Sequence, residues 1–172
     1  MQLVAEYSVM ARPDRSLIEI YDADAYLADE QAVRASHHHV VAGNGYHLYL
    51  RSLQPDLRVR ITIRVWDCPP PPPDDAEGHR PVILDSETGI LVINQLTFGP
   101  AGEMTLPQPG VYDGTTWWAG RQATWDYYAQ TLRQIDDAGT PERIAHAWSQ
   151  CPVPERYVLD LAYTGPSLPE DD

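Results

Sequence analysis

PVILDSETGILVIN, residues 81–94, is the stretch that decides the fold of this chain, because it holds two short apolar runs on either side of a turn signal. The runs Val82–Asp85 and Ile90–Asn94 have the length and composition of β-strands. Between them lies Ser-Glu-Thr-Gly, and Gly89 can take the positive φ that a hairpin requires. The sequence therefore predicts that these two strands pair antiparallel.

The chain after this stretch continues with closely spaced strands. Glu103–Leu106 alternates between polar and apolar residues, with Met104 and Leu106 on one face. Pro107–Gly110 then breaks the chain before a further strand opens at Val111. Short strands with turn signals about every eight to twelve residues are typical of a sandwich or barrel rather than a parallel α/β sheet.

The clearest strand of the chain is Asp56–Asp67. One face carries Leu57, Val59, Ile61, Ile63 and Val65, and the opposite face carries Arg58, Arg60, Thr62, Arg64 and Trp66. A helix would not separate these residues so cleanly. The alternation indicates one buried face and one solvated face, as in an antiparallel sheet that is covered on one side.

Three further segments of the N-terminal half follow the same logic. Gln2–Met10 and Ser16–Tyr21 alternate as strands, and Met10–Ser16 is expected to join them as a hairpin connection. Tyr46–Ser52 alternates again. Asp22–His39 lacks a period of two and is rich in Asp, Ala, Glu and His, so we expect a loop or a short helix there.

The pattern changes to a helical period after residue 121. Apolar residues in Ala123–Asp137 recur every three or four positions, which predicts a helix. A second helix is expected to begin with Thr140 as its cap and Pro141 at its first position, and to run through Trp148. Arg156–Thr164 alternates once more and makes a plausible closing strand.

Together these elements predict a mainly β chain, folded as an antiparallel β-sandwich with one or two C-terminal helices packed near the last strand. Its length fits a single sandwich domain over residues 1–165, with a Pro-rich loop at 69–79 and a helical segment at 122–150. Residues 166–172 form an acidic tail. Within the loop, Pro69–Pro73 favours extended polyproline geometry, so we expect a surface loop between the two sheets, with a docking site for an aromatic-lined groove as the alternative.

The charge balance limits the partners of the chain. It has 12 basic and 25 acidic residues, a net charge of −13, and every basic residue is arginine. Such a chain is a poor nucleic-acid or membrane binder, but it suits a protein partner with a basic surface. The arginine bias is consistent with a GC-rich bacterial genome. There is no apolar run long enough to span a membrane and no signal-peptide pattern, so we expect a cytoplasmic protein.

Histidine and cysteine residues offer little sign of a metal or redox site. His37, His38 and His39 are adjacent, so at most two of them could bind one metal ion, and no partner lies at a recognisable spacing. We expect solvated histidines, with adventitious metal binding as the alternative, and no cofactor. Cys68 and Cys151 are expected to be thiols rather than a disulfide.

An aromatic cluster is the first candidate binding site. Trp117, Trp118 and Trp125 lie close together in sequence at a strand-to-helix junction. Such residues usually pack in a core or between a helix and a sheet. If they are exposed, they would suit a protein partner or a carbohydrate.

An arginine stripe is the second candidate. Arg58, Arg60 and Arg64 share one strand face, and Arg51 could join them from a neighbouring strand. They would either pair with carboxylates of the same sheet or receive an anionic ligand or the carboxylates of a partner.

Catalytic motifs are missing from the sequence, which has no nucleophile elbow, zinc-protease helix, phosphate loop or dinucleotide fingerprint. This favours a non-enzymatic binding protein. A small-ligand or carbohydrate-binding module is one alternative, and an enzyme whose site is built from loops is another.

Residues 85–112 also resemble a known family. The order of Glu87–Ile93, then Leu106-Pro107, then Gly110–Tyr112 is similar to the small β-sandwich family of the bacterial competence protein that inhibits the DNA-entry nuclease. The resemblance implies a non-enzymatic inhibitor or immunity-type protein. The five-proline insertion and the helical segment Gln122–Gln150 depart from that family, and no functional residue carries over.

Overall fold

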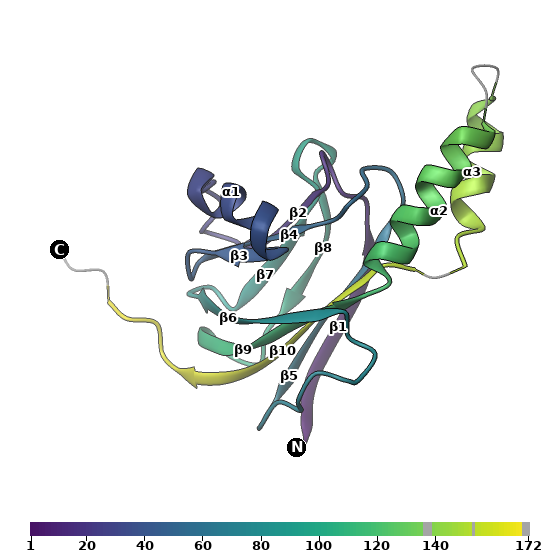
Figure 1. Ribbon diagram of the computed structural model, residues 1–172. Helices are drawn as coiled ribbons and strands as arrows, with labels where there is room; N and C mark the ends of the chain where they lie inside the picture. The colour runs from purple at the N-terminus through teal and green to yellow at the C-terminus, as the bar shows by residue number, and fades with distance from the viewer. Residues whose placement is uncertain (136–138, 153, 170–172) are drawn as a thin grey trace.

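The computed structural model describes residues 1–135, 139–152 and 154–169, which form two five-stranded sheets and the helices around them (Figure 1). The first sheet has the spatial order β1 (Leu3–Ala11), β5 (Val59–Trp66), β10 (Arg156–Gly165), β9 (Gly110–Ala119) and β6 (Gly78–Ser86). The second sheet has the order β3 (Val41–Gly43), β4 (His47–Arg51), β2 (Leu17–Asp22), β7 (Ile90–Asn94) and β8 (Pro100–Thr105). The mainly β prediction is confirmed. The pairing is mostly antiparallel, but β5 and β10 run parallel, which the sequence analysis did not expect.

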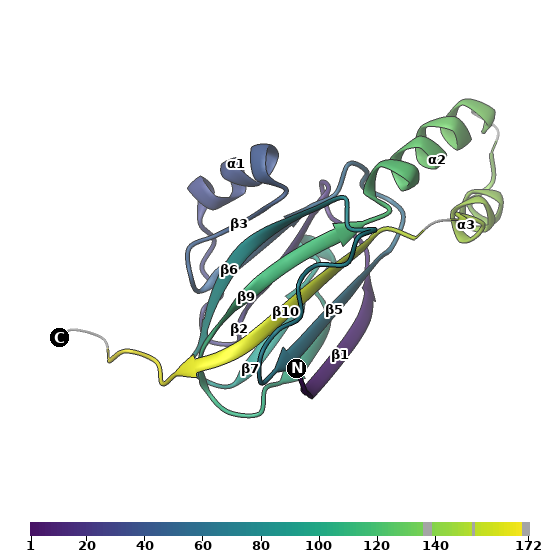
Figure 2. The same cartoon turned by 60° about the horizontal axis from the view of Figure 1, so that its bottom comes forward.

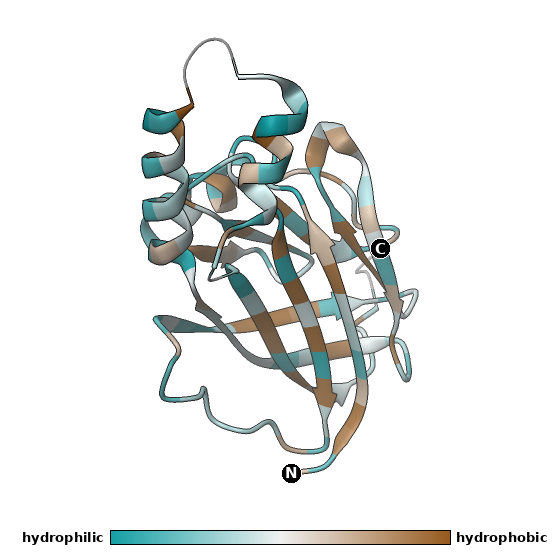
Figure 3. Cartoon of the chain, turned by 90° about the vertical axis from the view of Figure 1, so that its right-hand side faces the viewer, coloured by the Kyte–Doolittle hydropathy of each residue, from teal (hydrophilic) through white to brown (hydrophobic). Residues whose placement is uncertain are grey.

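The hydrophobic core draws on both sheets. From the first sheet it takes Val59, Ile61, Ile63 and Val65 of β5, and from the second Ile18 and Ile20 of β2 and Leu91 and Ile93 of β7. Figure 3 shows the hydrophobic residues along the strands. The apolar face predicted for Asp56–Asp67 is confirmed, because these β5 residues are all buried. The opposite face is solvated at Arg58 and Arg60 but not throughout, since Thr62 is also buried and Arg64 and Trp66 are half-buried.

The predicted hairpin of Val82–Asp85 with Ile90–Asn94 is wrong, because β6 and β7 belong to different sheets. Gly89 does adopt a positive φ of 75°, but the turn carries the chain from one sheet to the other. Asp22 at the end of β2 holds this crossing. Its Oδ1 accepts hydrogen bonds from Ser86 Oγ at 2.6 Å and from the backbone N–H of Thr88 at 3.1 Å.

The predicted hairpin between the first two strands is also wrong. β1 pairs with β5, whereas β2 pairs with β4 and β7 in the other sheet. β1 and β2 each turn an apolar face to the core, but β1 does so from the first sheet and β2 from the second. Two strands that pair in one sheet have the same alternation of apolar and polar residues, so the sequence pattern alone does not distinguish the two arrangements.

Helical elements of the described residues connect the strands: α1 (Glu30–His39), the 3-10 turn η1 (Leu96–Phe98), α2 (Arg121–Gln134) and α3 (Pro141–Ser149). α1 settles the alternatives for Asp22–His39, since a helix capped by Asp29 occupies its second half. α3 begins as predicted, with Thr140 accepting a hydrogen bond from the N–H of Arg143 and Pro141 in the first turn. α2 overlaps the predicted Ala123–Asp137 but begins two residues earlier, at Arg121, and residues 136 and 137 of the prediction lie outside the described residues.

The last strand, β10, is confirmed, but it lies between β5 and β9 and does not close an edge. β5 and β6 therefore sit on either side of it, and the Pro-rich segment that connects them passes over the outer face of the first sheet (Figure 2). Ala76 of this segment packs on Trp117 and Val158. The expectation that the loop joins the two sheets is wrong, since both of its ends belong to the same sheet.

Two smaller observations complete the fold. Cys68 and Cys151, both described, are not joined by a disulfide, as expected. Within residues 1–135, 139–152 and 154–169, no helix is long and apolar enough to cross a membrane.

Candidate functional site

A buried carboxylate, Asp160, organises the outer face of the first sheet. It lies in the middle of β10 and is 1% exposed. Arg64 of β5 donates to it twice, from Nε at 2.7 Å and from Nη2 at 3.0 Å. The indole N–H groups of Trp66 and Trp117 also donate to it, at 2.8 and 2.9 Å. A buried carboxylate needs such donors, so Arg64 and Trp117 are held in place by internal hydrogen bonds.

The structure does not bring the three predicted tryptophans together. Trp117 and Trp118 are neighbours on β9, so their side chains point to opposite faces of the sheet. Trp118 belongs to the hydrophobic core, where it packs so closely on Gly78 that a Cβ there would lie 2.4 Å from its ring. Trp125 lies on α2 and is 37% exposed.

The predicted arginines divide in the same way. Arg58 and Arg60 are exposed at one end of the outer face, and Arg60 Nη1 donates to Ser8 Oγ at 3.4 Å. Neither makes an ion pair with any described residue. Arg64 is the one of the three that pairs with a carboxylate, Asp160. Arg51 does not join the stripe, because β4 belongs to the second sheet.

α2 and α3 form a helical hairpin that projects beyond the sheets (Figure 1). The Tyr128 ring packs against Trp148 at a centroid distance of 5.1 Å and against Trp125 at 5.8 Å. Its hydroxyl donates to Asp56 at 2.7 Å and so ties the hairpin to the segment before β5. Burial and the neighbouring Asp56 raise the pKa of Tyr128 to about 12, so the hydroxyl remains a donor.

Exposed carboxylates line the base of this hairpin. Glu77, at the end of the Pro-rich segment, accepts from the N–H of Gln122 at 3.4 Å, and Gln122 Nε2 donates to Asp126 at 3.0 Å. We call Glu77 and Asp126 the acidic strip. Both are exposed, and no ion pair among the described residues involves them, in contrast to Asp75, which pairs with an arginine of β10 at 2.6 Å.

Trp125 lies beside the acidic strip. Gln122, Trp125 and Asp126 share one side of α2, because residues three and four positions apart in a helix are neighbours. An exposed indole next to unpaired carboxylates combines an apolar anchor with negative charge. Such a surface suits a partner that presents arginine or lysine beside an apolar patch.

A buried polar cluster lies where the hairpin returns to the sheet. Glu155, just before β10, is fully buried and accepts from Ser52 Oγ at 2.7 Å and from Tyr157 Oη at 3.1 Å. Burial raises the pKa of Glu155 to about 7, although the hydrogen bonds oppose this shift. Glu155 was not predicted from the sequence, since a lone glutamate before a strand has no local signature.

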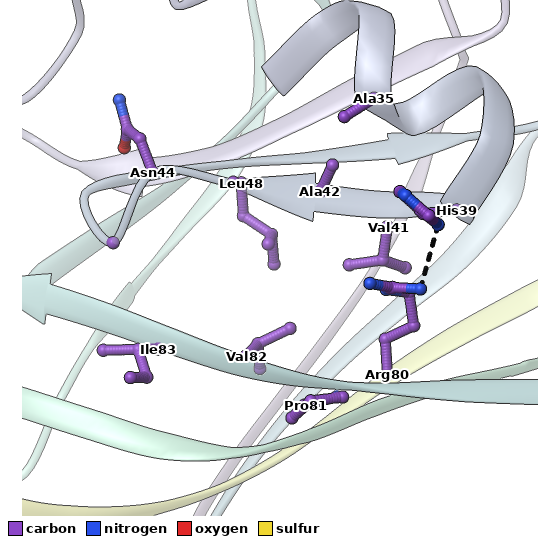
Figure 4. Close-up of a pocket in the computed structure, with 12 residues that line it drawn as sticks. Ala35, His39, Val41, Ala42, Asn44, Leu48, Arg80, Pro81, Val82 and Ile83 are labelled. Carbon is purple, nitrogen blue, oxygen red and sulfur yellow. Dashed lines mark hydrogen bonds between the residues drawn. The ribbon is translucent and has the colours of Figure 1, made fainter. Parts of the chain in front are cut away.

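A cavity of about 600 Å³ opens between α1 and β3 on one side and β6 on the other (Figure 4). Val41, Leu48 and Val82 supply apolar walls, and Arg80 Nη1 lies 3.0 Å from His39 Nδ1 at one end. Arg80 makes no ion pair within the described part of the chain. The cavity therefore presents a cation, which does not suit a basic partner.

The histidine triplet ends α1, and all three residues are exposed. No group of three or more His, Cys, Asp or Glu side chains among the described residues is arranged to hold a metal ion.

Comparison with solved structures shows two with the same fold. The crystal structure of ComJ, inhibitor of the DNA degrading activity of NucA, from Bacillus subtilis aligns over 95% of this chain and 98% of that chain, with a TM-score of 0.60 and 10% identity. A structure described as crocagin biosynthetic gene J aligns over 94% of this chain and 100% of that chain, with a TM-score of 0.52 and 14% identity. No family model and no curated protein matches the chain by sequence. The predicted resemblance to the competence inhibitor is confirmed at the level of the fold.

Proposed function

We propose that this protein is a non-enzymatic binding protein of inhibitor type, which uses the acidic strip and Trp125 to bind a protein partner with a basic surface. The observation that carries this function is the combination of two exposed carboxylates that form no ion pair among the described residues with an exposed indole at the base of a projecting hairpin. The net charge of −13 favours fast association with a basic partner.

The shared fold supports the inhibitor type. ComJ inhibits the DNA-degrading activity of NucA, and a nuclease must carry basic residues to hold its substrate. An acidic protein that covers such a surface blocks access to DNA. A nuclease is therefore the first class of partner to test.

We also infer the architecture and setting in which this binding occurs. The two sheets form a β-sandwich around the shared core, residues 1–165 act as one domain with 166–172 as an acidic tail, and binding takes place in the bacterial cytoplasm. The exposed Arg58 and Arg60 lie on the same outer face as the Pro-rich segment, so we expect them to contact carboxylates of the partner outside its basic surface.

A carbohydrate-binding function has less support than partner binding. Such a site needs a concave surface lined by aromatic rings, and no tryptophan lines either the cavity between α1 and β6 or a second cavity on the other side of α1, beside Leu17 and Tyr49. The buried Trp117 and Trp118 serve packing and hydrogen bonding instead.

The test is capture of partners from a lysate of the native host on immobilised protein, followed by mass spectrometry. We expect a protein with a basic surface to bind the wild type and to be lost from the double variant Glu77→Arg/Asp126→Arg. Raising the ionic strength should weaken capture, because exposed charges are screened.

A matched control distinguishes the acidic strip from net charge. Glu103→Arg reverses an exposed carboxylate on β8, in the second sheet, and changes the net charge as much as the single variant Asp126→Arg does. Glu103→Arg should capture the partner as the wild type does, whereas Asp126→Arg should capture less. If the captured protein degrades DNA, addition of the wild type should inhibit it. Equal capture by the wild type and the double variant would exclude the acidic strip as the binding surface.

A further inference from the structure

A second cavity, of about 450 Å³, lies on the outer face of the second sheet beside α1. Leu17, Val33 and Leu96 give it apolar walls, and Tyr49 forms part of its floor. Glu19, Arg51 and Arg15 also line it. It therefore combines apolar surface with groups of both charges, which is the composition of a small-ligand site.

The carboxylate in this cavity is fixed from behind. Glu19 is only 5% exposed, and its Oε1 accepts a hydrogen bond from Asn94 Nδ2 at 3.1 Å. Its Oε2 contacts His47 Nε2, and the His47 ring stacks between Tyr21 and Tyr49 at centroid distances of 4.6 and 4.7 Å. A carboxylate has about four acceptor positions, so this one retains capacity for a further donor from the cavity.

Two arginines face the same space. In the pairing of β2 with β4, Leu17 lies opposite Arg51 and Glu19 opposite Tyr49. Glu19 and Arg51 are thus diagonal neighbours on adjacent strands, for which the Cα–Cα distance is about 7–8 Å. Arg51 is oriented by Ser36 Oγ at 2.9 Å and still has unused N–H groups, and Arg15 makes no ion pair with a described residue.

Unusual backbone geometry gathers at this cavity. Four non-glycine residues of the described chain have a positive φ, and three of them, Arg15, Ser16 and Leu96, line the cavity or adjoin it. Asp14 links the two turns by accepting from the N–H of Thr97 at 2.9 Å. Such conformations are costly and cluster at binding sites.

We propose that this cavity binds a free α-amino acid with an apolar side chain. The ammonium group donates to Glu19, the carboxylate accepts from Arg51 and Arg15, and the side chain packs on Leu17, Val33 and Leu96. The diagonal spacing of Glu19 and Arg51 suits this ligand. It leaves room for one small zwitterion between the two side chains, so that each side chain can form a hydrogen bond to the ligand. This site is separate from the acidic strip, so its test does not depend on partner binding.

The test is isothermal titration calorimetry of the full chain with L-leucine, 4-methylpentanoic acid and isopentylamine. The last two keep the apolar group but lack the ammonium or the carboxylate. We expect saturable binding of leucine, and affinity lower by about tenfold or more for each analogue, because each loses charge-assisted hydrogen bonds. Absence of saturable heat with leucine at millimolar concentration, or equal affinity for all three compounds, would overturn the assignment.

Variants locate the site without disturbing the core. Arg15→Ala removes an exposed guanidinium and should weaken leucine binding by about tenfold with an unchanged melting temperature. Arg58→Ala, which removes an exposed arginine before β5, should bind leucine as the wild type does. If the two variants bind leucine equally, leucine does not bind in this cavity.

Discussion

The outer face of the first sheet and the α2–α3 hairpin carry the same kinds of residue, tryptophan and charged side chains, but use them differently. On the sheet, Trp117 and Arg64 both donate to the buried Asp160. On the hairpin, Trp125 is exposed, and Asp126 beside it pairs with no cation among the described residues. Burial and ion pairing distinguish a structural cluster from a surface that is available to a partner.

The largest loss of unfolding free energy is expected when the buried carboxylate of Asp160 is removed. Asp160→Ala leaves the donors of Arg64, Trp66 and Trp117 without their acceptor in a buried setting. It should lower the free energy of unfolding by about 3–5 kcal/mol, which urea denaturation would measure. The variant should still fold only if this loss is smaller than the free energy of unfolding of the wild type.

Asp126→Ala is the matched control on the hairpin. It removes the same group from an exposed position, so the free energy of unfolding should change by no more than about 0.5 kcal/mol. Similar losses for the two variants would mean that the two regions do not differ as described.

The junction between the two regions should respond to pH. Burial raises the pKa of Glu155 from 4.5 to about 7 in the folded state. The folded protein therefore holds this proton more tightly than the unfolded chain does. The stabilisation is complete below about pH 4.5 and is lost as the pH rises to about 7.

Glu155→Gln isolates this effect from all other titrating groups. Relative to the variant, the wild type should lose about 3 kcal/mol of stability between these two pH values. Denaturant midpoints of both proteins across this range would measure the difference. Parallel pH profiles would show that Glu155 does not titrate in this range.

A smaller contrast lies within one strand. Arg64→Ala removes two hydrogen bonds to a buried carboxylate and should cost about 1.5–3 kcal/mol of unfolding free energy. Arg60→Ala removes an exposed side chain and should cost no more than about 0.5 kcal/mol. Thermal denaturation of the two variants side by side would decide it, and a reversed order would contradict the assigned faces.

The sequence predicted the strands well because a period of two reports a half-buried face directly. β5 and β10 and the cap of α3 at Thr140 all lie where local patterns placed them. The pairing of strands was predicted poorly, because strands on opposite sides of one core have the same pattern as strands that pair. The crossing at Gly89 depends on Asp22, which lies over sixty residues earlier in the chain.

The candidate surface was predictable only in part. Trp125 was predicted as a binding residue, but its separation from Trp117 and Trp118 was not. That separation depends on the direction in which α2 leaves β9, and closeness in sequence does not reveal this direction. The acidic strip unites Glu77 with Asp126 through Gln122, and no spacing in the sequence connects them. Asp160 was missed because its partners come from other strands, and Glu155 because its burial depends on Ser52, which lies about a hundred residues earlier in the chain.

The measurement that tests the central claim most directly is the affinity of the captured partner for Trp125→Ala and Trp117→Phe. If the partner binds at the hairpin, Trp125→Ala should weaken binding by about thirtyfold with little loss of stability. Trp117→Phe should lower stability by about 1–2 kcal/mol and leave the affinity unchanged. Loss of affinity in Trp117→Phe together with full affinity in Trp125→Ala would contradict this account.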